Sequence, residues 1–194
     1  MLLLTKPSKA RIGLFIDTQS GFDFSDPNAR DDLMQASRGY TVDCNRIELG
    51  RGAQVFARAA AGLARWEMFK LGWLELLPAE APIEKGTTVA VLVHHLGFWS
   101  LNACRIARVI DEDGMVQKYG FVYGTLPDHA EQGRERFTVE WNRDSDRVFY
   151  DIVACSRPNK LIAKLGYPFT RALQKRFARD SMQAMVRAVS VARP

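Results

Sequence analysis

The stretch YGFVYGTLPDHAEQGRERFTVEW, from Tyr119 to Trp141, decides the fold, because it holds two alternating strands with a polar turn between them. Successive side chains of a strand point to opposite faces, so the aromatic residues of the first strand share one face and its glycines share the other. Two glycines on one face indicate a close approach, either by a ligand or by the backbone of a sheet that bends around a helix. We favour the bend. The stretch therefore predicts a hairpin of a curved sheet, with a catalytic loop as the alternative.

Strands on both sides extend this hairpin into a larger sheet. The preceding segment TTVAVLVHHLGFWSLNACRIARVIDEDG is rich in β-branched and apolar residues, breaks at Gly97 and ends at the turn Asp113-Gly114, which predicts two strands. The following segment RVFYDIVACS predicts one more. About five consecutive strands joined by short turns favour an antiparallel meander over a parallel sheet with helical crossovers.

A strand and a helix come before the meander. The segment GYTVDCNRIELG alternates as a strand does, and GRGAQVFARAAAGLARWEMFK places its apolar residues at helical spacing. Residues from Trp73 to Leu77 predict a short strand, which ends at the Pro-rich connection PAEAPIEKG.

A long amphipathic helix is predicted near the end of the chain. The residues after Pro158 read as a helix that is interrupted near Gly166-Tyr167-Pro168. Beyond the interruption the apolar residues fall mostly on one stripe, and the basic residues Arg171, Lys175 and Arg179 lie away from it. Such a helix needs an apolar surface, and the concave face of the curved sheet is the only large candidate. The predicted class is α+β.

The order strand, helix, antiparallel strands and long final helix is that of the helix-grip fold, in which a curved sheet wraps the C-terminal helix. Five motifs carry a sharper resemblance: GYTVDCNRIELGRG, RWEMFKLGW, WSLNACRI, the opening stretch and the SRP of residues 156–158. From about Gly39 to the last helix, the chain resembles an uncharacterised family catalogued as domain of unknown function 1990 (DUF1990, UPF0548). That family is similar in layout to the START-like, or SRPBCC, ligand-binding proteins and has no established reaction. The resemblance therefore implies a fold and no catalytic residues.

We expect one domain over residues 39–194 and a partly irregular N-terminal extension over residues 1–38. In the extension, the apolar run from Ile12 to Ile16 ends at Asp17, as the apolar strand of a phosphotransfer site does. Asp17-Thr18-Gln19 lacks the second aspartate that holds magnesium in such a site. We therefore expect a structural role for the extension.

The composition predicts a soluble cytoplasmic protein. Its 194 residues, 47% of them hydrophobic, suffice for one sizeable core. No window approaches the roughly 20 apolar residues of a membrane-spanning helix, and the first residues lack the apolar run of a secretion signal. The cysteines, Cys44, Cys104 and Cys155, lack CxxC spacing, so we expect neither a disulfide framework nor a cysteine zinc site. The net charge of +5 favours an anionic partner without defining one, and the oligomeric state stays open.

Candidate ligand-binding residues are polar and aromatic residues of the predicted sheet: Trp73, Trp99, Asn102, Arg105, Tyr119, Phe121, Tyr123, His129, Glu140 and Tyr150. Alternation puts Asn102 and Arg105 on opposite faces, so at most one of them lines a cavity. A buried arginine needs a partner. Arg105 therefore points outward, meets an acid such as Glu140, or holds a ligand carboxylate or phosphate. For Trp73 and Trp99, packing in the core is the favoured interpretation.

Acid and base chemistry depends on where the carboxylates of the opening stretch point. Glu131, Glu135, Glu140 and His129 are close in sequence, and burial raises the pKa of such carboxylates toward neutrality. Glu140 alternates with the aromatic residues of its strand. If the aromatic face lines the core, as we expect, Glu140 faces solvent.

We expect no metal and no cofactor. A zinc site needs at least three converging protein ligands. The chain has three histidines, and the neighbours His94 and His95 face opposite ways on one strand, so at most one of them joins His129. The sequence also lacks a Gly-x-Ser-x-Gly elbow and a phosphate-binding loop.

Three functions are compatible with these patterns. The leading hypothesis is the binding of a small hydrophobic or amphipathic molecule in a cavity between the sheet and the last helix. An enzyme of the cyclase or hydrolase type in the same cavity is the alternative, and it requires a titratable side chain that reaches the cavity in a perturbed environment. The third is weak nucleic-acid or anionic-surface binding through Arg171, Lys175, Arg176 and Arg179. Such charges usually form a solvated helix face, which disfavours this function.

Overall fold

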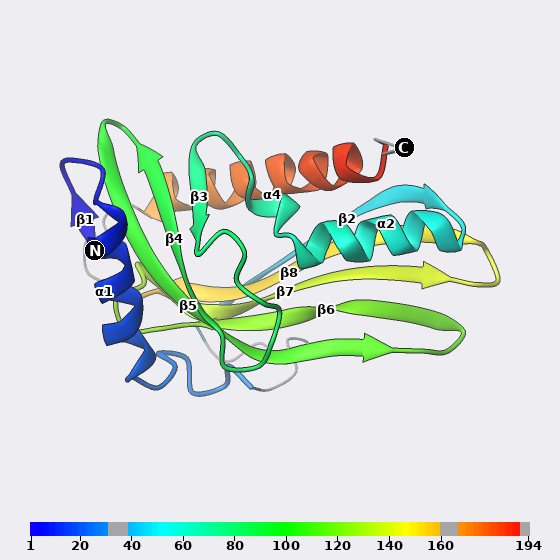
Figure 1. Ribbon diagram of the computed structural model, residues 1–194, viewed down its shortest axis with the longest axis horizontal. Helices are drawn as coiled ribbons and strands as arrows, with labels where there is room; N and C mark the ends of the chain where they lie inside the picture. Colours follow the sequence, from blue (N-terminus) through cyan, green and yellow to red (C-terminus); the bar gives the residue numbers. More distant parts are fainter. Residues whose placement is uncertain (31–38, 160–166, 191–194) are drawn as a thin grey trace.

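The computed structural model describes residues 1–30, 39–159 and 167–190. Its elements follow in the order β1 (Leu2–Leu3), α1 (Lys9–Ser20), β2 (Thr41–Arg51), α2 (Ala53–Ala64), the 3-10 helix η1 (Glu67–Phe69), β3 (Leu74–Leu77), β4 (Thr88–His95), β5 (Phe98–Glu112), β6 (Val116–Thr125), β7 (Glu131–Asn142), β8 (Arg147–Pro158) and α4 (Tyr167–Ser190) (Figure 1). The predicted strands and helices from Gly39 onward are confirmed. The part of the last helix that was predicted before Gly166 lies outside the described residues.

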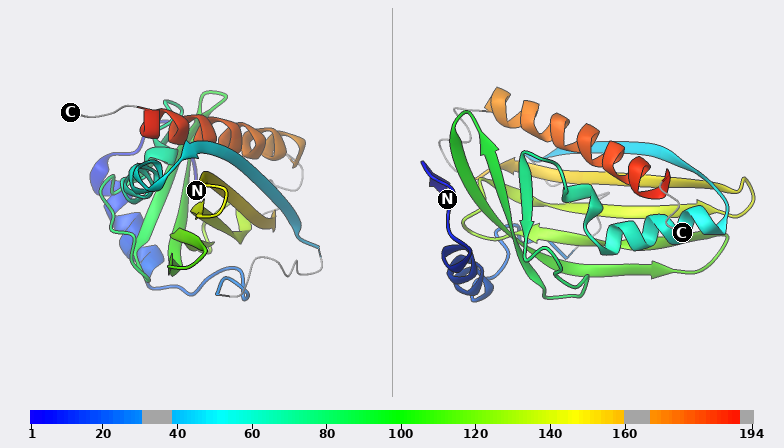
Figure 2. Two further views of the ribbon diagram at one scale, coloured as in Figure 1. Left: turned by 90° about the vertical axis from the view of Figure 1, so that its right-hand side faces the viewer. Right: turned by 45° about the horizontal axis from the view of Figure 1, so that its top comes forward.

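The strands form one antiparallel sheet in the order β2-β8-β7-β6-β5-β4-β3, with β1 paired to β5. The meander predicted from sequence is β4 to β8, in which each strand pairs with the next. The sheet curves around α4, and α2 lies on the same side as α4 (Figure 2). This arrangement is the predicted α+β helix-grip fold.

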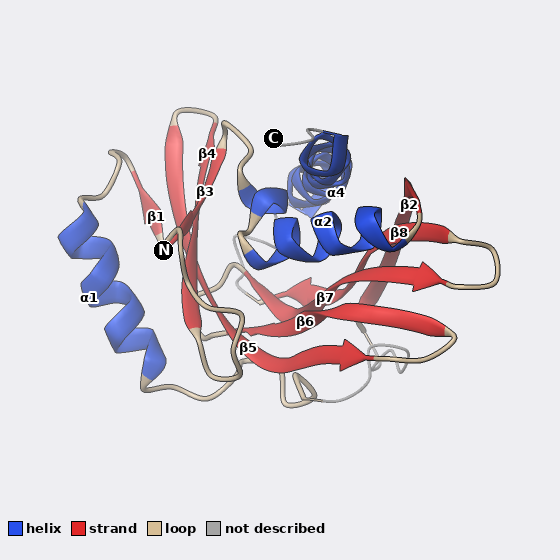
Figure 3. Cartoon of the chain, turned by 45° about the vertical axis from the view of Figure 1, so that its right-hand side comes forward, coloured by secondary structure: helices blue, strands red, loops and turns tan. Residues whose placement is uncertain are grey.

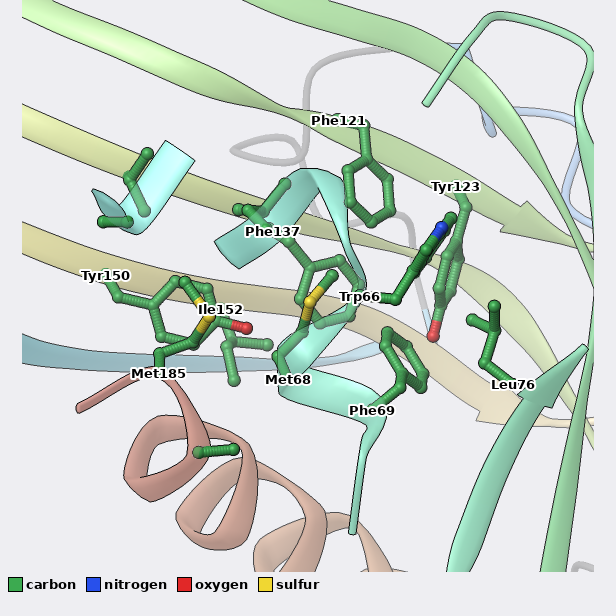
Figure 4. Close-up of a cluster of buried hydrophobic side chains, with 14 of the residues drawn as sticks. Trp66, Met68, Phe69, Leu76, Phe121, Tyr123, Phe137, Tyr150, Ile152 and Met185 are labelled. Carbon is green, nitrogen blue, oxygen red and sulfur yellow. The ribbon is translucent and has the colours of Figure 1, made fainter. Parts of the chain in front are cut away.

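The main core fills the concave side of the sheet. Helix α2 has its buried residues Phe56, Ala59 and Leu63 at helical spacing, so one stripe of the helix faces the sheet. At Gly62 an added Cβ would lie 3.4 Å from the Cβ of Ala188, so α2 and α4 pass close to each other there. The centre of this core is a cluster of aromatic side chains from η1, β6, β7 and β8 (Figure 4).

Gly120 and Gly124, the glycines of the first strand of the opening stretch, face the convex side, and the protein itself makes the close approach that they permit. A Cβ on Gly120 would lie 2.1 Å from the carbonyl oxygen of Phe137 on β7. A Cβ on Gly124 would lie 2.7 Å from the Cβ of Ala29, in the N-terminal segment. Gly120 thus permits close packing of β6 against β7, and Gly124 permits the docking of the N-terminal segment, a contact that the sequence analysis did not predict.

The N-terminal segment covers the outer side of the sheet, opposite α2 and α4 (Figure 3). Ile12 and Phe15 of α1 pack against Leu92 and Leu101 of β4 and β5. Residues 12–16, the apolar run that ends at Asp17, lie inside a helix and do not form a strand like that of a phosphotransfer site. Ile12 and Phe15 are three residues apart, which is the spacing of one helix face and not of one strand face.

Candidate ligand cavity

A cavity of about 700 Å³ lies between the concave face of the sheet and the first half of α4. Most of its wall is apolar, from Phe69, Trp73, Leu74, Val91, Val93, Ile152, Phe169, Leu173 and Phe177. Trp73 contacts α4 from the cavity wall. Its Nε1 donates to Asp180 Oδ2 at 3.0 Å, and the Arg176 guanidinium lies 4.4 Å from its ring centre.

One row of side chains across four strands gives the cavity its polar floor. Tyr123 of β6 is opposite Glu135 of β7, Glu135 is opposite Ala154 of β8, and Ala154 is opposite Asp43 of β2. Residues opposite each other on neighbouring strands point to the same face. Because Ala154 has only a methyl side chain, the row is open between Glu135 and Asp43.

The next row along the same strands is apolar over three of its four positions. It consists of Phe121, Phe137, Ile152 and Asn45, and the first three are almost completely buried. The ring centres of Phe121 and Phe137 are 5.2 Å apart in a stacked arrangement. Ile152 and Asn45 of this row line the cavity and Phe121 and Phe137 do not, so the cavity ends at this row, beside the polar one.

Glu135 is a titratable group of this row with a perturbed pKa. The Tyr123 hydroxyl donates a hydrogen bond of 2.7 Å to Glu135 Oε2. The pKa of Glu135 is raised to about 7, mainly by burial and to a smaller extent by the negative charges of Glu131 and Asp43, against the opposing effect of the Tyr123 hydrogen bond. This carboxyl group therefore exchanges its proton near neutral pH.

Glu131 and Asp43 connect the cavity to α4. Burial raises the pKa of Glu131, while hydrogen bonds from Ser156 and from the Gln174 amide oppose the change. Arg171 of α4 holds both carboxylate oxygens of Asp43, with Nη2 at 2.6 Å from Oδ1. Such two-point contacts fix orientation as well as distance, so the first turns of α4 are anchored over the polar row.

Two histidines also line the cavity. The backbone N–H of Glu131 donates to His129 Nδ1 at 3.0 Å, which fixes the turn between β6 and β7. Burial lowers the pKa of His95, whose ring lies 5.5 Å from that of Phe169. Within residues 1–30, 39–159 and 167–190, no group of three or more His, Cys, Asp and Glu side chains is arranged to hold a metal ion.

Four of the candidate residues named from sequence line the cavity: Trp73, Asn102, Tyr123 and His129. The prediction that Asn102 and Arg105 face opposite sides is confirmed, because Arg105 lies on the outer face. There its guanidinium donates to the carbonyl oxygens of Gln19 and Ser20 at 3.2 and 2.7 Å. These are carbonyls at the C-terminal end of α1, where a positive charge is favourable.

The other candidates lie away from the cavity, for identifiable reasons. Phe121 and Tyr150 are buried in the core, where the Tyr150 hydroxyl lies 3.1 Å from Ser181 Oγ of α4, and Tyr119 packs against the edge of that core. Glu140 is on the convex face as expected, paired with Arg46 at 3.0 Å. Trp99 is on the outer face, stacked on His94 at 4.4 Å.

The sequence analysis missed part of the polar row. Glu135 shares a face with Phe137, Val139 and Trp141, so the same alternation that turned Glu140 outward places Glu135 inside. Asp43 and Ala154 carry no local signal, because they reach Glu135 only through the pairing of β2 with β8 and of β8 with β7.

A curved antiparallel sheet that holds a cavity beneath its C-terminal helix defines a helix-grip protein. The chain belongs to the family described as domain of unknown function (DUF1990), whose model matches residues 27–184. The resemblance seen in the motifs is thus confirmed. Among the described residues, no helix has the length and apolar character to cross a membrane.

Several relatives and solved structures are similar to this chain. A UPF0548 protein of Dictyostelium discoideum is 41% identical over 77% of this chain and 73% of its own length. A UPF0548 protein of Deinococcus radiodurans is 36% identical over 74% of this chain and 76% of its own length. Among solved structures, norcoclaurine synthase from Thalictrum flavum in complex with dopamine and hydroxybenzaldehyde aligns with a TM-score of 0.47 and 12% identity. That alignment covers 84% of this chain and 92% of the synthase chain.

Proposed function

We propose that the protein binds a small amphipathic molecule in the cavity between the sheet and α4. The observation that carries the proposal is the cavity itself, which has about 700 Å³ of space, a mainly apolar wall and one polar row. Ligand sites typically have volumes of roughly 300 to 1,000 Å³ and combine apolar walls with a few convergent polar groups.

The apolar wall and the polar row each suit a different part of the ligand. Its apolar body lies against Phe69, Leu173 and Phe177, where burial of apolar surface contributes roughly 25 cal/mol per Å². Its polar end lies over the row of Tyr123 and Glu135, because a polar group taken from water needs hydrogen-bond partners. Of the residues named from sequence, this site keeps the four that line the cavity.

A substitution that fills part of the cavity tests the proposal. Ala154→Leu extends a branched side chain from the centre of the polar row into the space that the ligand would occupy. The matched control is Ala172→Leu, the same exchange at an exposed position of α4 that does not line the cavity. Isothermal titration calorimetry with 1-decanol serves as the assay.

The unmodified protein and Ala172→Leu are expected to bind 1-decanol with the same affinity, and Ala154→Leu is expected to bind it at least about tenfold more weakly. Circular dichroism establishes that all three proteins are folded. Equal binding to a folded Ala154→Leu protein, or no binding to the unmodified one, contradicts the proposal.

An acid–base enzyme is the second candidate, and one observation favours it. Glu135 faces the cavity, has a pKa raised to about 7 by burial and is hydrogen-bonded to Tyr123. A carboxyl group with a pKa near the working pH suits proton transfer to or from a bound substrate. Of the groups that the sequence analysis named for acid–base chemistry, His129, Glu131 and Glu135 line the cavity, and Glu140 lies outside it.

Native mass spectrometry separates the two candidates. The molecules that co-purify with the unmodified protein and with Glu135→Gln are compared by mass. A binding protein retains the same molecule in both. An enzyme retains product in the unmodified protein and unconverted substrate in Glu135→Gln. Identical masses therefore contradict the enzyme hypothesis.

The basic residues of α4 give little support to nucleic-acid binding. Arg171 is held by Asp43, and Arg176 and Arg179 both lie within ion-pair distance of Asp180. Charges already compensated within the protein release few counterions on contact with nucleic acid.

A further inference from the structure

We propose that the ligand of this cavity carries a protonated primary amine at its polar end, held by the carboxylate of Glu135. The inference rests on the proposed binding function and specifies the chemical class of the ligand.

The described cations around the cavity are placed on groups other than Glu135. Among the described residues, the lining of the cavity includes these with charged or titratable side chains: Asp43, His95, Tyr123, Asp128, His129, Glu131, Arg134, Glu135, Arg171 and Lys175. Two of the cations are engaged by carboxylates, Arg171 by Asp43 and Arg134 by the buried Asp26. The third, Lys175, is solvent-exposed on α4, and the N-terminal ammonium of Met1, which also lines the cavity, donates to the carbonyl oxygens of Leu101 and Asp128.

Glu135 in particular receives no positive charge from its described surroundings. The charges that act on its pKa are those of Glu131 and Asp43, both negative, and its one hydrogen bond comes from the neutral hydroxyl of Tyr123. A carboxylate in such a place is stabilised strongly by a cation that enters with the ligand, because a charge-assisted hydrogen bond is then formed away from bulk water.

The shape of the row suits an ammonium group. Strands lie about 4.8 Å apart, so Glu135 and Asp43, separated by the strand of Ala154, have backbones roughly 10 Å apart. The methyl group of Ala154 leaves the space between them open. An ammonium group has three donors and no acceptor. It therefore matches a floor whose exposed groups are carboxylate and hydroxyl oxygens.

Other polar ends fit this floor less well. An alcohol brings one donor and no charge, so it forms a neutral or singly charged hydrogen bond with Glu135. A ligand carboxylate brings a second negative charge beside Glu135 and Glu131, and like charges at this distance repel. The expected order of affinity is amine, then alcohol, then carboxylate, for the same apolar chain.

Calorimetric titrations with decylamine, 1-decanol and decanoate at pH 8 test this order. The three probes share a ten-carbon chain and differ at the polar end. At pH 8 Glu135 is largely ionised, because its pKa is about 7. Decylamine is expected to bind about tenfold more tightly than 1-decanol, and decanoate more weakly than either.

Variants connect the preference to Glu135. Glu135→Gln keeps the size of the side chain and removes its charge, so it is expected to bind decylamine and 1-decanol equally. Glu135→Asp withdraws the carboxylate by one methylene group and is expected to keep part of the preference. The matched control is Glu140→Gln, the same exchange on the convex face of the same strand, which is expected to leave all three affinities unchanged.

The outcomes separate the inference from the function on which it rests. If 1-decanol binds and decylamine binds no more tightly, or if Glu135→Gln retains the preference, the amine inference is overturned and the binding function stands. If none of the three probes binds, the binding function fails as well. Glu135→Asp keeps a charged residue and gives the comparison a second variant should Glu135→Gln fail to fold.

Discussion

The concave face of the sheet has a solid end and a hollow end, and strands β6, β7 and β8 run through both. At the solid end the row of Phe121, Phe137 and Ile152 fills the space under α2 and the second half of α4. At the hollow end, one row away, Glu135 and Ala154 leave a cavity under the first half of α4. The difference shows that the curvature of the sheet does not by itself make a cavity; the side chains of successive rows do.

The helices sharpen this contrast. The buried stripe of α2 and the residues Ala184, Met185 and Val189 of α4 belong to the solid core. The first half of α4 contributes Phe169, which lines the cavity and is 38% exposed. One helix thus seals the fold with its C-terminal half and covers the cavity with its N-terminal half.

Removing a large side chain from the solid end gives the largest expected effect on stability. Phe137→Ala leaves a void where the ring is completely buried, at 0% exposure. We expect a loss of about 3 to 5 kcal/mol in the free energy of unfolding, measured by urea denaturation. The control is Phe169→Ala at the hollow end, with an expected loss below about 1 kcal/mol. Similar losses for the two variants contradict the division into solid and hollow ends.

The titration of Glu135 gives the next largest effect. Its pKa is about 7 in the folded protein, against an ordinary value of 4.5, so between these pH values the folded state holds a proton that the unfolded chain has released. The free energy of unfolding therefore falls as the pH rises through this range, by up to about 3 kcal/mol. Glu135→Gln is expected to remove this loss and to be the more stable protein at pH 8.

Urea denaturation at pH 5, 6, 7 and 8 measures this titration. Glu140→Gln, on the convex face, serves as the control and is expected to follow the unmodified protein. Glu131 also has a raised pKa and contributes a change of the same sign in every variant. A Glu135→Gln protein whose stability falls with pH as steeply as that of the unmodified protein contradicts the assignment.

The smallest expected effect compares the same exchange at both ends. Tyr150→Phe breaks the buried contact with Ser181 and is expected to lower stability by about 1 kcal/mol. Tyr123→Phe breaks the bond to Glu135 at the cavity wall, where water has room to replace the hydroxyl, and is expected to lower stability at pH 5 by less than about 0.5 kcal/mol. Equal losses in thermal or urea denaturation would show that the two environments do not differ.

The fold was predictable because its signals are local and repeated. Alternation over β6 and β7 and the apolar stripe beyond Pro168 each define a secondary structure and its buried face. The same alternation separated Asn102 from Arg105 and turned Glu140 outward. Alternation within one strand does not show which residues of the neighbouring strands lie opposite it.

The polar row shows this limit. Glu135 was within reach of the alternation rule, but Asp43 lies more than ninety residues away along the chain and meets it only through the order β2-β8-β7. Arg105 shows it too. Its partners are backbone carbonyls of Gln19 and Ser20, which have no side-chain signature and belong to a helix that the sequence analysis did not predict.

The position of Trp73 allows ligand binding in the cavity to be followed by tryptophan fluorescence. The chain has four tryptophans, and Trp73 lines the cavity, whereas Trp66 is enclosed in the core and Trp99 stacks on the outer face. Indole fluorescence shifts with the polarity of its surroundings. A ligand that binds in the cavity is therefore expected to change the emission of Trp73, while the emission of Trp66 stays constant. The protein therefore reports the filling of its own cavity without a dye or a label.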